Sequence, residues 1–459
     1  MPSNSADKYI LAINAGSSSL KLALYRTHFH DATPTLVLTS SISKLTSEEP
    51  IFAYSHDESL SDTHKPTKTT ISLPSDSPHA AAFTHFLEHL KSDPSIPDSA
   101  PDLTVHRIVH GGTATQPSLL TQETLSDLQS LSDLAPLHNT PALAILNHLL
   151  ASPLKHRKHV LYYDTIFHRS IPAATRTYAI SPTSTSAGLP IERYGFHGLS
   201  YSSILHSVSS FLDTPPSNLN LLVLHLGSGC SAAAICGGVS VDTTMGLTPL
   251  EGLPGATRAG SMDPSVVFHL HIAKPGAKEE MGEGMAVSRA EEILNTKCGW
   301  AAMTGTKDLG EIVGRAEEGD EGCRLALDVF VERVAKECAG LWVKMQGEVD
   351  AVVFAGGVGE RGVEVRRRIA EGLSCLGVRV DERLNRAVER REGEVVVIGG
   401  ERVSEWGGPK VLVAKTDEEG EMVRQCVEDE RFWEGQRTKK TPDENTEATA
   451  DANTEENAV

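Results

Sequence analysis

The chain opens with an apolar run, a hydroxyl-rich turn and an alternating run. Residues 9–13 are apolar, Asn14-Ala-Gly-Ser-Ser-Ser19 follows, and leucines then alternate with polar or small residues over 20–24. This pattern predicts a β-hairpin whose turn carries hydroxyl groups, backbone N–H groups and Lys21. Such a turn suits a bound phosphate, although it is not a Walker loop, whose lysine follows a glycine-rich run that opens a helix. Taken alone, the stretch also fits a serine-rich hairpin that binds nothing.

A similar pattern begins the second half of the chain. Residues 220–226 are mainly apolar, Gly227-Ser-Gly229 forms the next turn, and residues 230–235 are small or apolar. The chain then passes Gly237-Gly238 into a third expected strand that ends at Asp242. Two such units about 210 residues apart indicate a duplicated domain.

Apolar runs and amphipathic stretches predict the remaining elements. Strands are expected at 103–109, 158–163, 350–355, 394–398 and 410–414. Helices are expected at 79–91, 118–134 and 141–151, in 285–317 and 320–347, at 363–374, and at about 416–435. The rest of 26–105 shows no clear period, and its Pro- and Ser-rich parts at 74–78 and 92–101 predict loops.

Polar residues stand at the ends of two expected strands. Arg107 lies in the apolar run 103–109, with His106 and His110 near it. An unpaired buried arginine is costly, so an ion pair or a bound anion would each explain Arg107. Asp164 follows the strand at 158–163, at the end of a sheet where ligands bind, and could hold magnesium or cap a helix.

Glycine-rich segments mark three further places. Gly195 and Gly198 flank His197, which favours a histidine presented in a loop. Residues 245–260 contain four glycines and Arg258, and we expect a functional loop there. The run 356–362 precedes an expected helix, and a glycine turn that opens a helix is a ready anion or nucleotide site.

Length, charge and cysteine usage narrow the class of protein. A length of 459 residues predicts two domains of roughly 200 residues. The formal net charge of −19 argues against nucleic acid as a partner. Seven scattered cysteines without zinc-ligand spacing predict reduced thiols. No apolar run approaches the roughly 18 residues of a membrane span, and no secretory signal is visible, so we expect a cytoplasmic protein without a membrane partner.

Together the motifs resemble the acetokinase family of the actin-like ATPase and sugar kinase superfamily. The matching segments follow the family's order from residue 8 to about 420. They are Asn14–Lys21, Arg107-Ile-Val-His-Gly-Gly, Pro136-Leu-His-Asn, Asp164-Thr-Ile-Phe-His, Tyr194-Gly-Phe-His-Gly, His225-Leu-Gly-Ser-Gly, Val241-Asp-Thr-Thr-Met-Gly-Leu-Thr-Pro-Leu-Glu-Gly, Thr257-Arg, Gly357-Val-Gly-Glu and Thr416-Asp-Glu-Glu.

This resemblance implies an α/β fold of two duplicated actin-like (ribonuclease H-like) domains with a catalytic cleft between them. Domain I would span 8–165 together with a C-terminal helix at about 416–435. Domain II, which would bind the nucleotide, would span 166–415. Residues 1–7 are expected to be flexible, and 436–459, which contain almost nothing apolar, to form a disordered acidic tail.

The resemblance also implies roles for individual residues. The catalytic set would be Asp164, Arg107, His197, Arg258 and His138. The acyl group would bind Val109, Leu137, Phe196 and Pro249, with Arg107 holding its carboxylate. The nucleotide and its phosphates would contact Ser17, Ser19, Lys21, His225, Leu226, Gly227, Ser228, Gly229, Asp308, Leu309, Gly310, Gly357, Val358, Gly359, Glu360 and Arg361. Magnesium, or manganese in its place, would be held by Asn14, Glu418 and Asp164.

The implied reaction is reversible phosphoryl transfer from ATP to acetate, which yields acetyl phosphate and ADP, and the implied assembly is a homodimer. A carboxylate is already ionised at neutral pH, so it needs no strong general base. The difficult step is to bring two anions together and to stabilise charge on the transferring oxygens. We therefore interpret Asp164 mainly as a positioning residue and metal partner.

Three departures from the family pattern lie on the nucleotide side. Ser228 and Arg361 each replace an asparagine, and the segment 306–310 lacks an aromatic–arginine pair after its aspartate. Pyrophosphate, which some divergent members use, therefore stays an alternative to ATP. An inactive actin-like protein that binds nucleotide as an interaction module is the alternative from another class. The intact Arg107, Asp164, His197 and Arg258 argue against it.

Overall fold

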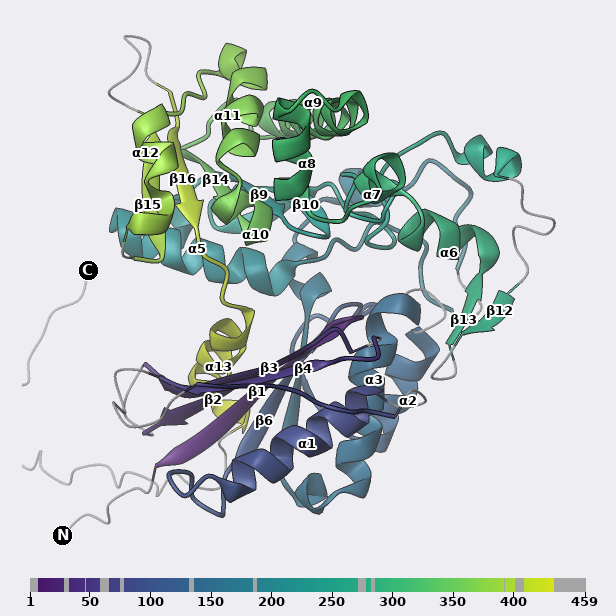
Figure 1. Cartoon of the computed structure of the whole chain (residues 1–459), viewed down its shortest axis with the longest axis vertical. Coiled ribbons are helices and arrows are strands. Elements are labelled where there is room, and N and C mark those ends of the chain that lie inside the picture. The colour runs from purple at the N-terminus through teal and green to yellow at the C-terminus, as the bar shows by residue number, and fades with distance from the viewer. Residues whose placement is uncertain are drawn as a thin grey trace, which may run out of the picture.

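The structure, a computed structural model, shows two lobes, each built on one large sheet (Figure 1). It describes residues 7–28, 33–45, 47–57, 66–74, 78–131, 136–184, 188–270, 278–281, 285–391, 393–400 and 408–432. The expectations for the N-terminus and for the acidic tail therefore fall almost entirely outside the described residues.

The first hairpin lies inside an eight-stranded sheet with the order β5-β4-β3-β2-β1-β6-β8-β7. Its strands are β1 (Lys8–Ala15), β2 (Ser19–Thr27), β3 (Thr35–Ser43), β4 (Ile51–His56), β5 (Thr67–Thr70), β6 (Leu103–Ile108), β7 (Ser118–Leu119) and β8 (Lys158–Tyr163). Strands β1, β6 and β8 are parallel, whereas β1 through β5 form antiparallel pairs. The predicted β-hairpin is confirmed.

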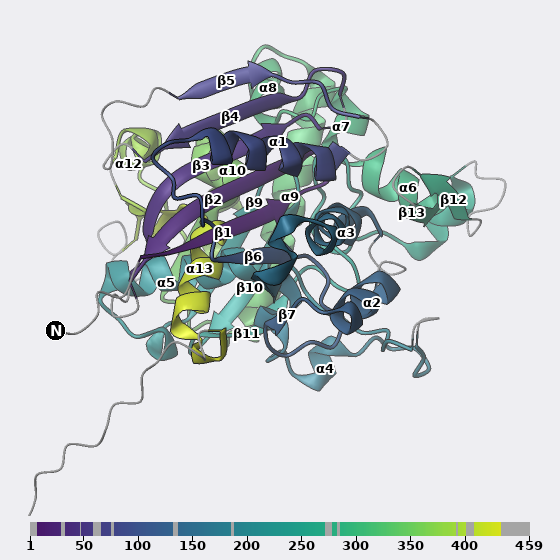
Figure 2. The same cartoon turned by 90° about the horizontal axis from the view of Figure 1, so that it is seen from below.

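Alternating side chains of β1 face two different layers. Leu11 and Ile13 pack with α1 (Pro78–Ser92), α2 (Gln122–Leu131) and α3 (Pro136–Ala151) on one face of the sheet. Ile10 and Ala12 pack on the other face with α13 (Glu418–Glu428), the last helix of the described chain. Figure 2 shows α1 crossing this sheet. The final helix thus returns to the first lobe, although the division of the chain near residue 165 stays a prediction.

The second lobe repeats the arrangement in a six-stranded sheet with the order β11-β10-β9-β14-β16-β15. Its strands are β9 (Leu221–Leu226), β10 (Cys230–Cys236), β11 (Val239–Thr243), β14 (Ala351–Ala355), β15 (Val395–Gly399) and β16 (Lys410–Ala414). Helix α5 (Gly198–Leu212) covers one face, and α8 (Leu309–Glu317), α9 (Glu321–Lys344) and α11 (Val363–Gly372) cover the other. The order β3-β2-β1-β6-β8 corresponds to β11-β10-β9-β14-β16, so the predicted duplicated α/β fold is confirmed.

Several predicted elements differ from the structure. Strands β3, β4 and β5 occupy part of 26–105, where no period was recognised. Ser40 takes a buried position in β3, β4 has apolar residues at the successive positions 51–54, and β5 has no apolar residue. The expected helix at 118–134 begins with strand β7, and α2 starts only at Gln122. Helix α3 begins at Pro136 rather than at 141, since a proline is well tolerated in the first turn.

The glycine run after β14 also differs from the expected turn. It forms the short helix α10 (Gly356–Arg361), in which the first glycine alone has a positive φ, +73°. The expected helical stretch 285–317 opens with the hairpin strand β13 (Met285–Ser288), which pairs with β12 (Lys278–Met281). It continues as α6 (Arg289–Thr296), α7 (Gly299–Thr304) and α8.

Short elements complete the described chain. They are η1 (Pro153–His156), η2 (Asp164–His168), α4 (Ala173–Arg176), η3 (Pro216–Asn218), η4 (Pro264–His269), η5 (Ser374–Leu376), α12 (Glu382–Arg386), η6 (Val388–Arg390) and η7 (Glu430–Phe432). Among the helices of the described residues, none has the length and apolar character needed to cross a bilayer.

Candidate active site

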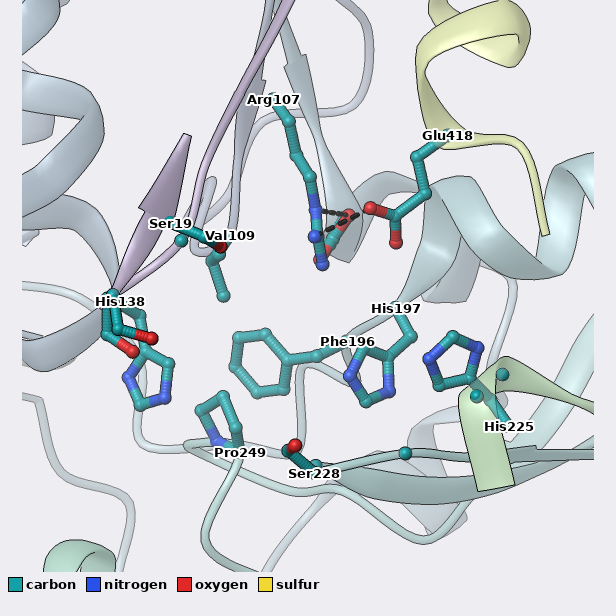
Figure 3. Close-up of a pocket in the computed structure, with 18 of the residues that line it drawn as sticks. Ser19, Arg107, Val109, His138, Phe196, His197, His225, Ser228, Pro249 and Glu418 are labelled. Carbon is teal, nitrogen blue, oxygen red and sulfur yellow. Dashed lines mark hydrogen bonds and ion pairs between the residues drawn. The ribbon is translucent and has the colours of Figure 1, made fainter. Parts of the chain in front are cut away.

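A cavity of about 700 Å³ lies where the two lobes meet. The β1–β2 turn, Arg107 and Asp164 line it from the first lobe, and the β9–β10 turn and Gly357 line it from the second. Figure 3 shows Arg107 and Glu418 entering from one side of this cavity and Ser228 lying on the other. Both hairpin turns that the sequence analysis singled out therefore meet at one site.

Arg107 is the centre of a largely buried ionic cluster. Its Nη2 donates to Asp164 Oδ2 at 2.7 Å, and its Nη1 donates to Glu418 Oε2 at 2.7 Å. Asn14 Nδ2 donates to Glu418 and Glu419 at 2.8 and 2.7 Å. The structure thus shows the ion-pair explanation for Arg107, and an anion as its further partner stays a prediction.

Burial and the Arg107 guanidinium act in opposite directions on these carboxyl groups. Burial raises the pKa of Asp164 despite the nearby arginine. Burial alone would also raise the pKa of Glu418, but Arg107 and the Ser200 hydroxyl group outweigh it and lower that pKa. Burial and the charge of Glu418 raise the pKa of Glu419. Glu418 is therefore the carboxyl group of this cluster that ionises most readily.

Gly198 allows Asp164 to lie against the N-terminus of α5. Asp164 begins η2 directly after β8, and the backbone of Leu199 donates to its carboxylate. A Cβ atom at Gly198 would lie 1.9 Å from the Asp164 carbonyl oxygen, which no side chain permits. The sequence offered two roles for Asp164, a magnesium ligand and a helix cap. Tyr163 precedes η2, so Asp164 does not cap that helix, but its carboxylate accepts from the first turn of α5.

His197 precedes α5 in the left-handed conformation, with a φ of +59°. Its ring lies next to that of His225, with centroids 4.3 Å apart. Its Nδ1 is 2.8 Å from Ser231 Oγ, which is 2.5 Å from Tyr201 Oη. Burial, together with the charge of His225, lowers the pKa of His197 well below its usual range. Nδ1 of this neutral ring is thus engaged with Ser231, and Nε2 is the ring nitrogen on the side of Gly229.

Arg258 is a half-buried cation that pairs with no carboxylate within the described part of the chain. Its Nη2 donates to His138 Nε2 at 2.9 Å, so the neutral His138 ring carries its proton on Nδ1. Burial lowers the pKa of Arg258, and burial with the charge of Arg258 lowers that of His138 well below its usual range. A Cβ atom at Gly229 would lie 2.9 Å from Arg258 Nη1 and 3.7 Å from His197 Nε2. These two groups therefore converge beside the β9–β10 turn.

An apolar wall adjoins the charged groups. Val109, Phe196 and Pro249 line the cavity, and Phe196 lies in the middle of the view in Figure 3. Phe196 packs with Tyr194 and Met245 in a small buried cluster. Leu137, predicted as a fourth member, lies in α3, and its side chain is outside the described part of the chain.

About half of the residues predicted for the nucleotide line the cavity. They are Ser17, Ser19, Lys21, His225, Gly227, Ser228, Gly229 and Gly357. The others do not line it. Leu226 and Leu309 are buried in the core of the second lobe. Asp308 caps α8 by accepting from the N–H groups of Gly310 and Glu311 at 2.8 and 3.4 Å.

The remaining predicted residues belong to α10. Gly359 is buried beneath β14, and Val358 packs against the core of the second lobe. Glu360 accepts from the backbone N–H of Thr416 at 3.3 Å. Arg361 is exposed, but a Cβ atom at Gly357 would lie 3.0 Å from its Nη2. The Arg361 guanidinium therefore lies over Gly357 at the edge of the cavity.

Ten lining residues were not among the predicted site residues. They are Ala15, Gly16, Ser18, Thr257, Asn295, Thr296, Lys307, Gly356, Thr416 and Glu419. Most adjoin a predicted residue and could have been found by extending each motif. Asn295 and Thr296 carry no such signal. Tertiary packing brings them there, because Cys298 N–H donates to Thr257 O at 3.0 Å and Trp300 N–H to Gly255 O at 3.3 Å.

The oxygen atoms of Asn14, Asp164 and Glu418 match the donor type that magnesium prefers. Within the described residues, no group of three or more His, Cys, Asp or Glu side chains is arranged to hold a metal ion. Magnesium at phosphate-transfer sites commonly uses one or two carboxylates, with substrate phosphates and waters as the other ligands. The residues near Asn14 fit such a partial ligand set.

Comparisons with known proteins point to one family. The sequence profile of the acetokinase family matches residues 9–424. A probable acetate kinase of Neurospora crassa is 38% identical over 452 residues, which cover 93% of this chain and 95% of that protein. An acetate kinase of Streptomyces avermitilis is 37% identical over 423 residues, which cover 91% of this chain and 96% of that protein.

Solved structures agree with this result. A propionate kinase from Francisella tularensis superposes with a TM-score of 0.75 at 27% identity, covering 91% of this chain and 98% of that chain. The acetate kinase of Porphyromonas gingivalis superposes with a TM-score of 0.72 at 26% identity, covering 92% of this chain and 100% of that chain. The chain therefore belongs to the acetokinase family of carboxyl-group phosphotransferases.

Proposed function

We propose that this chain catalyses reversible, magnesium-dependent phosphoryl transfer between ATP and acetate, with acetyl phosphate and ADP as the products. The observation that carries the proposal is the convergence of the Arg258 guanidinium and His197 Nε2 next to an apolar wall. A buried cation without a carboxylate partner is satisfied by a bound anion. The relatives named acetate kinase support acetate as the acceptor.

The acyl side follows from the lining residues. The methyl group of acetate packs against Val109, Phe196 and Pro249, and its carboxylate faces Arg107. The wall is short, which favours a small acyl chain, and apolar, which favours an uncharged one. Asp164 and Glu418 orient Arg107 through the two 2.7 Å ion pairs, which restrict the rotation of the guanidinium.

The phosphoryl side needs positive charge and hydrogen-bond donors. Arg258 supplies the charge, and His197 donates from Nε2 to the oxygens on which charge accumulates. The β1–β2 turn contributes hydroxyl and N–H groups, with Lys21 beside it. Asn14 and Glu418 would hold Mg²⁺, which when bound adds positive charge at the phosphate oxygens. A homodimer is part of the same proposal.

Trapping of the acyl phosphate tests this function. The protein is incubated with acetate, Mg²⁺, hydroxylamine and either ATP or pyrophosphate, and the acyl hydroxamate is measured. We expect product with ATP, and no product when EDTA removes the metal. Absence of product with ATP, pyrophosphate and polyphosphate alike would refute the enzymatic function and favour an inactive nucleotide-binding protein.

Pyrophosphate is the second candidate donor. The position of Arg361 over Gly357 and the presence of Lys307 in the cavity favour it, because they add cations where a nucleotide is expected. The segment 308–310, which was predicted to bind the nucleotide, does not line the cavity, and this also favours pyrophosphate over ATP. A higher kcat/KM with pyrophosphate than with ATP in the trapping assay would select this donor.

A further inference from the structure

Three carbonyl groups of the β1–β2 turn accept hydrogen bonds, one from within the turn and two from outside it. Gly16 N–H donates to Ser19 O at 2.8 Å, and Leu45 N–H donates to Ser18 O at 3.0 Å. The third contact comes from His79, whose Nε2 lies 2.9 Å from Gly16 O. A carbonyl oxygen can only accept, so Nε2 of His79 carries a hydrogen and donates it.

Two N–H groups of the turn are available to a ligand. Within the described residues, no acceptor takes the N–H group of Ser17 or Ser18, and both serines line the cavity. A turn with three engaged carbonyl oxygens and two free N–H groups attracts an anion.

His79 determines the direction of one of these N–H groups. The carbonyl of Gly16 and the N–H of Ser17 belong to the same planar peptide unit and point in opposite directions. The contact with His79 directs the carbonyl toward α1, so it also directs the Ser17 N–H away from α1. Gly16 has no side chain to hinder rotation of this peptide.

We propose that His79 is a positioning residue for the phosphoryl donor, which fixes the Gly16–Ser17 peptide so that the Ser17 N–H faces the donor phosphates. The proposal rests on the proposed function, in which those phosphates bind the β1–β2 turn. His79 itself is 2% exposed and does not line the cavity, so it acts through the peptide and not by contact with the substrate. Without His79 the peptide can rotate and present the Gly16 carbonyl oxygen to the phosphates, which it repels.

Three variants test the role of the donated hydrogen bond. His79→Leu removes the donor at similar size, His79→Gln keeps a donor of similar reach, and His79→Asn keeps a donor one methylene shorter. In the trapping assay we expect His79→Leu to raise KM for the phosphoryl donor about tenfold or more, because a lost hydrogen bond to a charged group has that effect. KM for acetate should stay within twofold, and His79→Gln should restore KM for the donor.

His85→Leu is the matched control. His85 lies on the same helix, where its ring packs against Phe52 at 4.8 Å and is remote from the turn. We expect this variant to leave both KM values unchanged. Equal donor KM values for wild type and His79→Leu, or equal rises in both KM values, would overturn the proposal. If His79→Leu does not fold, the Gln and Asn variants replace it in the test, because only Gln reaches the Gly16 carbonyl oxygen. Equal KM values for the phosphoryl donor in these two variants would then overturn the proposal.

A binding measurement separates this proposal from the proposed reaction. The rise in Tm caused by ADP with Mg²⁺, or by pyrophosphate with Mg²⁺, is measured for wild type and for each variant. We expect His79→Leu to lose most of this ligand-induced rise while His79→Gln retains it, even if no acyl phosphate forms. A full ligand-induced rise in His79→Leu, with only a lower Tm of the free protein, would show a purely structural role.

Discussion

Two half-buried arginines of this cavity perform different electrostatic tasks. Burial alone would lower the pKa of Arg107, but Asp164 and Glu418 outweigh burial and raise it. Arg258 has only the neutral His138 as a side-chain partner in the described part of the chain, and burial lowers its pKa. Arg107 is therefore already neutralised by protein carboxylates, whereas Arg258 keeps its positive charge available for a phosphoryl group.

Replacing Arg258 tests this difference. We expect Arg258→Ala to lower kcat by about 10³–10⁵, the usual cost of losing an arginine that stabilises phosphoryl transfer. The acyl hydroxamate assay at saturating substrates measures the effect. Arg157→Ala is the control, because Arg157 is exposed and its side chain donates only to Ser99 O among the described residues. A turnover of Arg258→Ala near that of the control would contradict the role of Arg258.

At the scale of elements, the contact between η2 and the start of α5 determines where Asp164 lies. Gly198 approaches the Asp164 carbonyl oxygen so closely that any Cβ atom must displace one of the two elements. His197 immediately precedes Gly198, so the same displacement would move the His197 ring. One glycine thus positions two predicted catalytic residues that come from different parts of the sequence.

Gly198→Ala should therefore reduce both stability and activity. We expect a loss of about 1–3 kcal/mol in the free energy of unfolding, as for an overpacked core, together with a lower kcat. Urea denaturation and the trapping assay measure the two effects. Gly314→Ala in α8 is the control: no atom lies within 4 Å of its Cβ position, so a gain of about 0.5–1 kcal/mol is expected there. Equal behaviour of the two variants would argue against the close contact.

The same elements show what the sequence could and could not predict. The hairpin turns were predictable because apolar alternation on both sides of a small-residue turn is a local signal. Strands β3–β5 were missed because Ser40 takes a buried position in β3, β4 has successive apolar residues and β5 has none. Asn295 and Thr296 were missed because only the packing of α6 and α7 against the loop near Arg258 brings them to the cavity.

At the scale of the whole molecule, buried neutral histidines link stability to pH. Burial lowers the pKa of His110, His168 and His225 to about 4. In the unfolded chain the same rings titrate near 6.5, so below that pH the unfolded state binds more protons than the folded state. The stabilisation is fully present above pH 6.5 and is lost as the pH falls toward 4.

The free energy of unfolding should therefore fall between pH 7.5 and pH 6. These three rings alone contribute a decrease of about 2 kcal/mol. His106, His138 and His197, whose pKa values burial lowers well below the usual range, add to it, so urea denaturation at both pH values should give at least this decrease. The raised pKa values of Asp164 and Glu419 act in the opposite direction, and they act most strongly at lower pH. His156→Gln, a change at an exposed ring, should leave the decrease unaltered. A constant or rising free energy over this interval would contradict the expectation.

The return of α13 to the first lobe has a consequence for biosynthesis. The strands of the first sheet leave the ribosome early, but Glu418, Glu419 and the apolar residues of α13 that cover Ile10 and Ala12 are made hundreds of residues later. At elongation rates of about 5–20 residues per second, one face of this sheet stays uncovered for tens of seconds. A nascent chain that stops before residue 418 therefore exposes an apolar sheet surface and leaves Arg107 without Glu418, which makes it a natural target for chaperones and proteases.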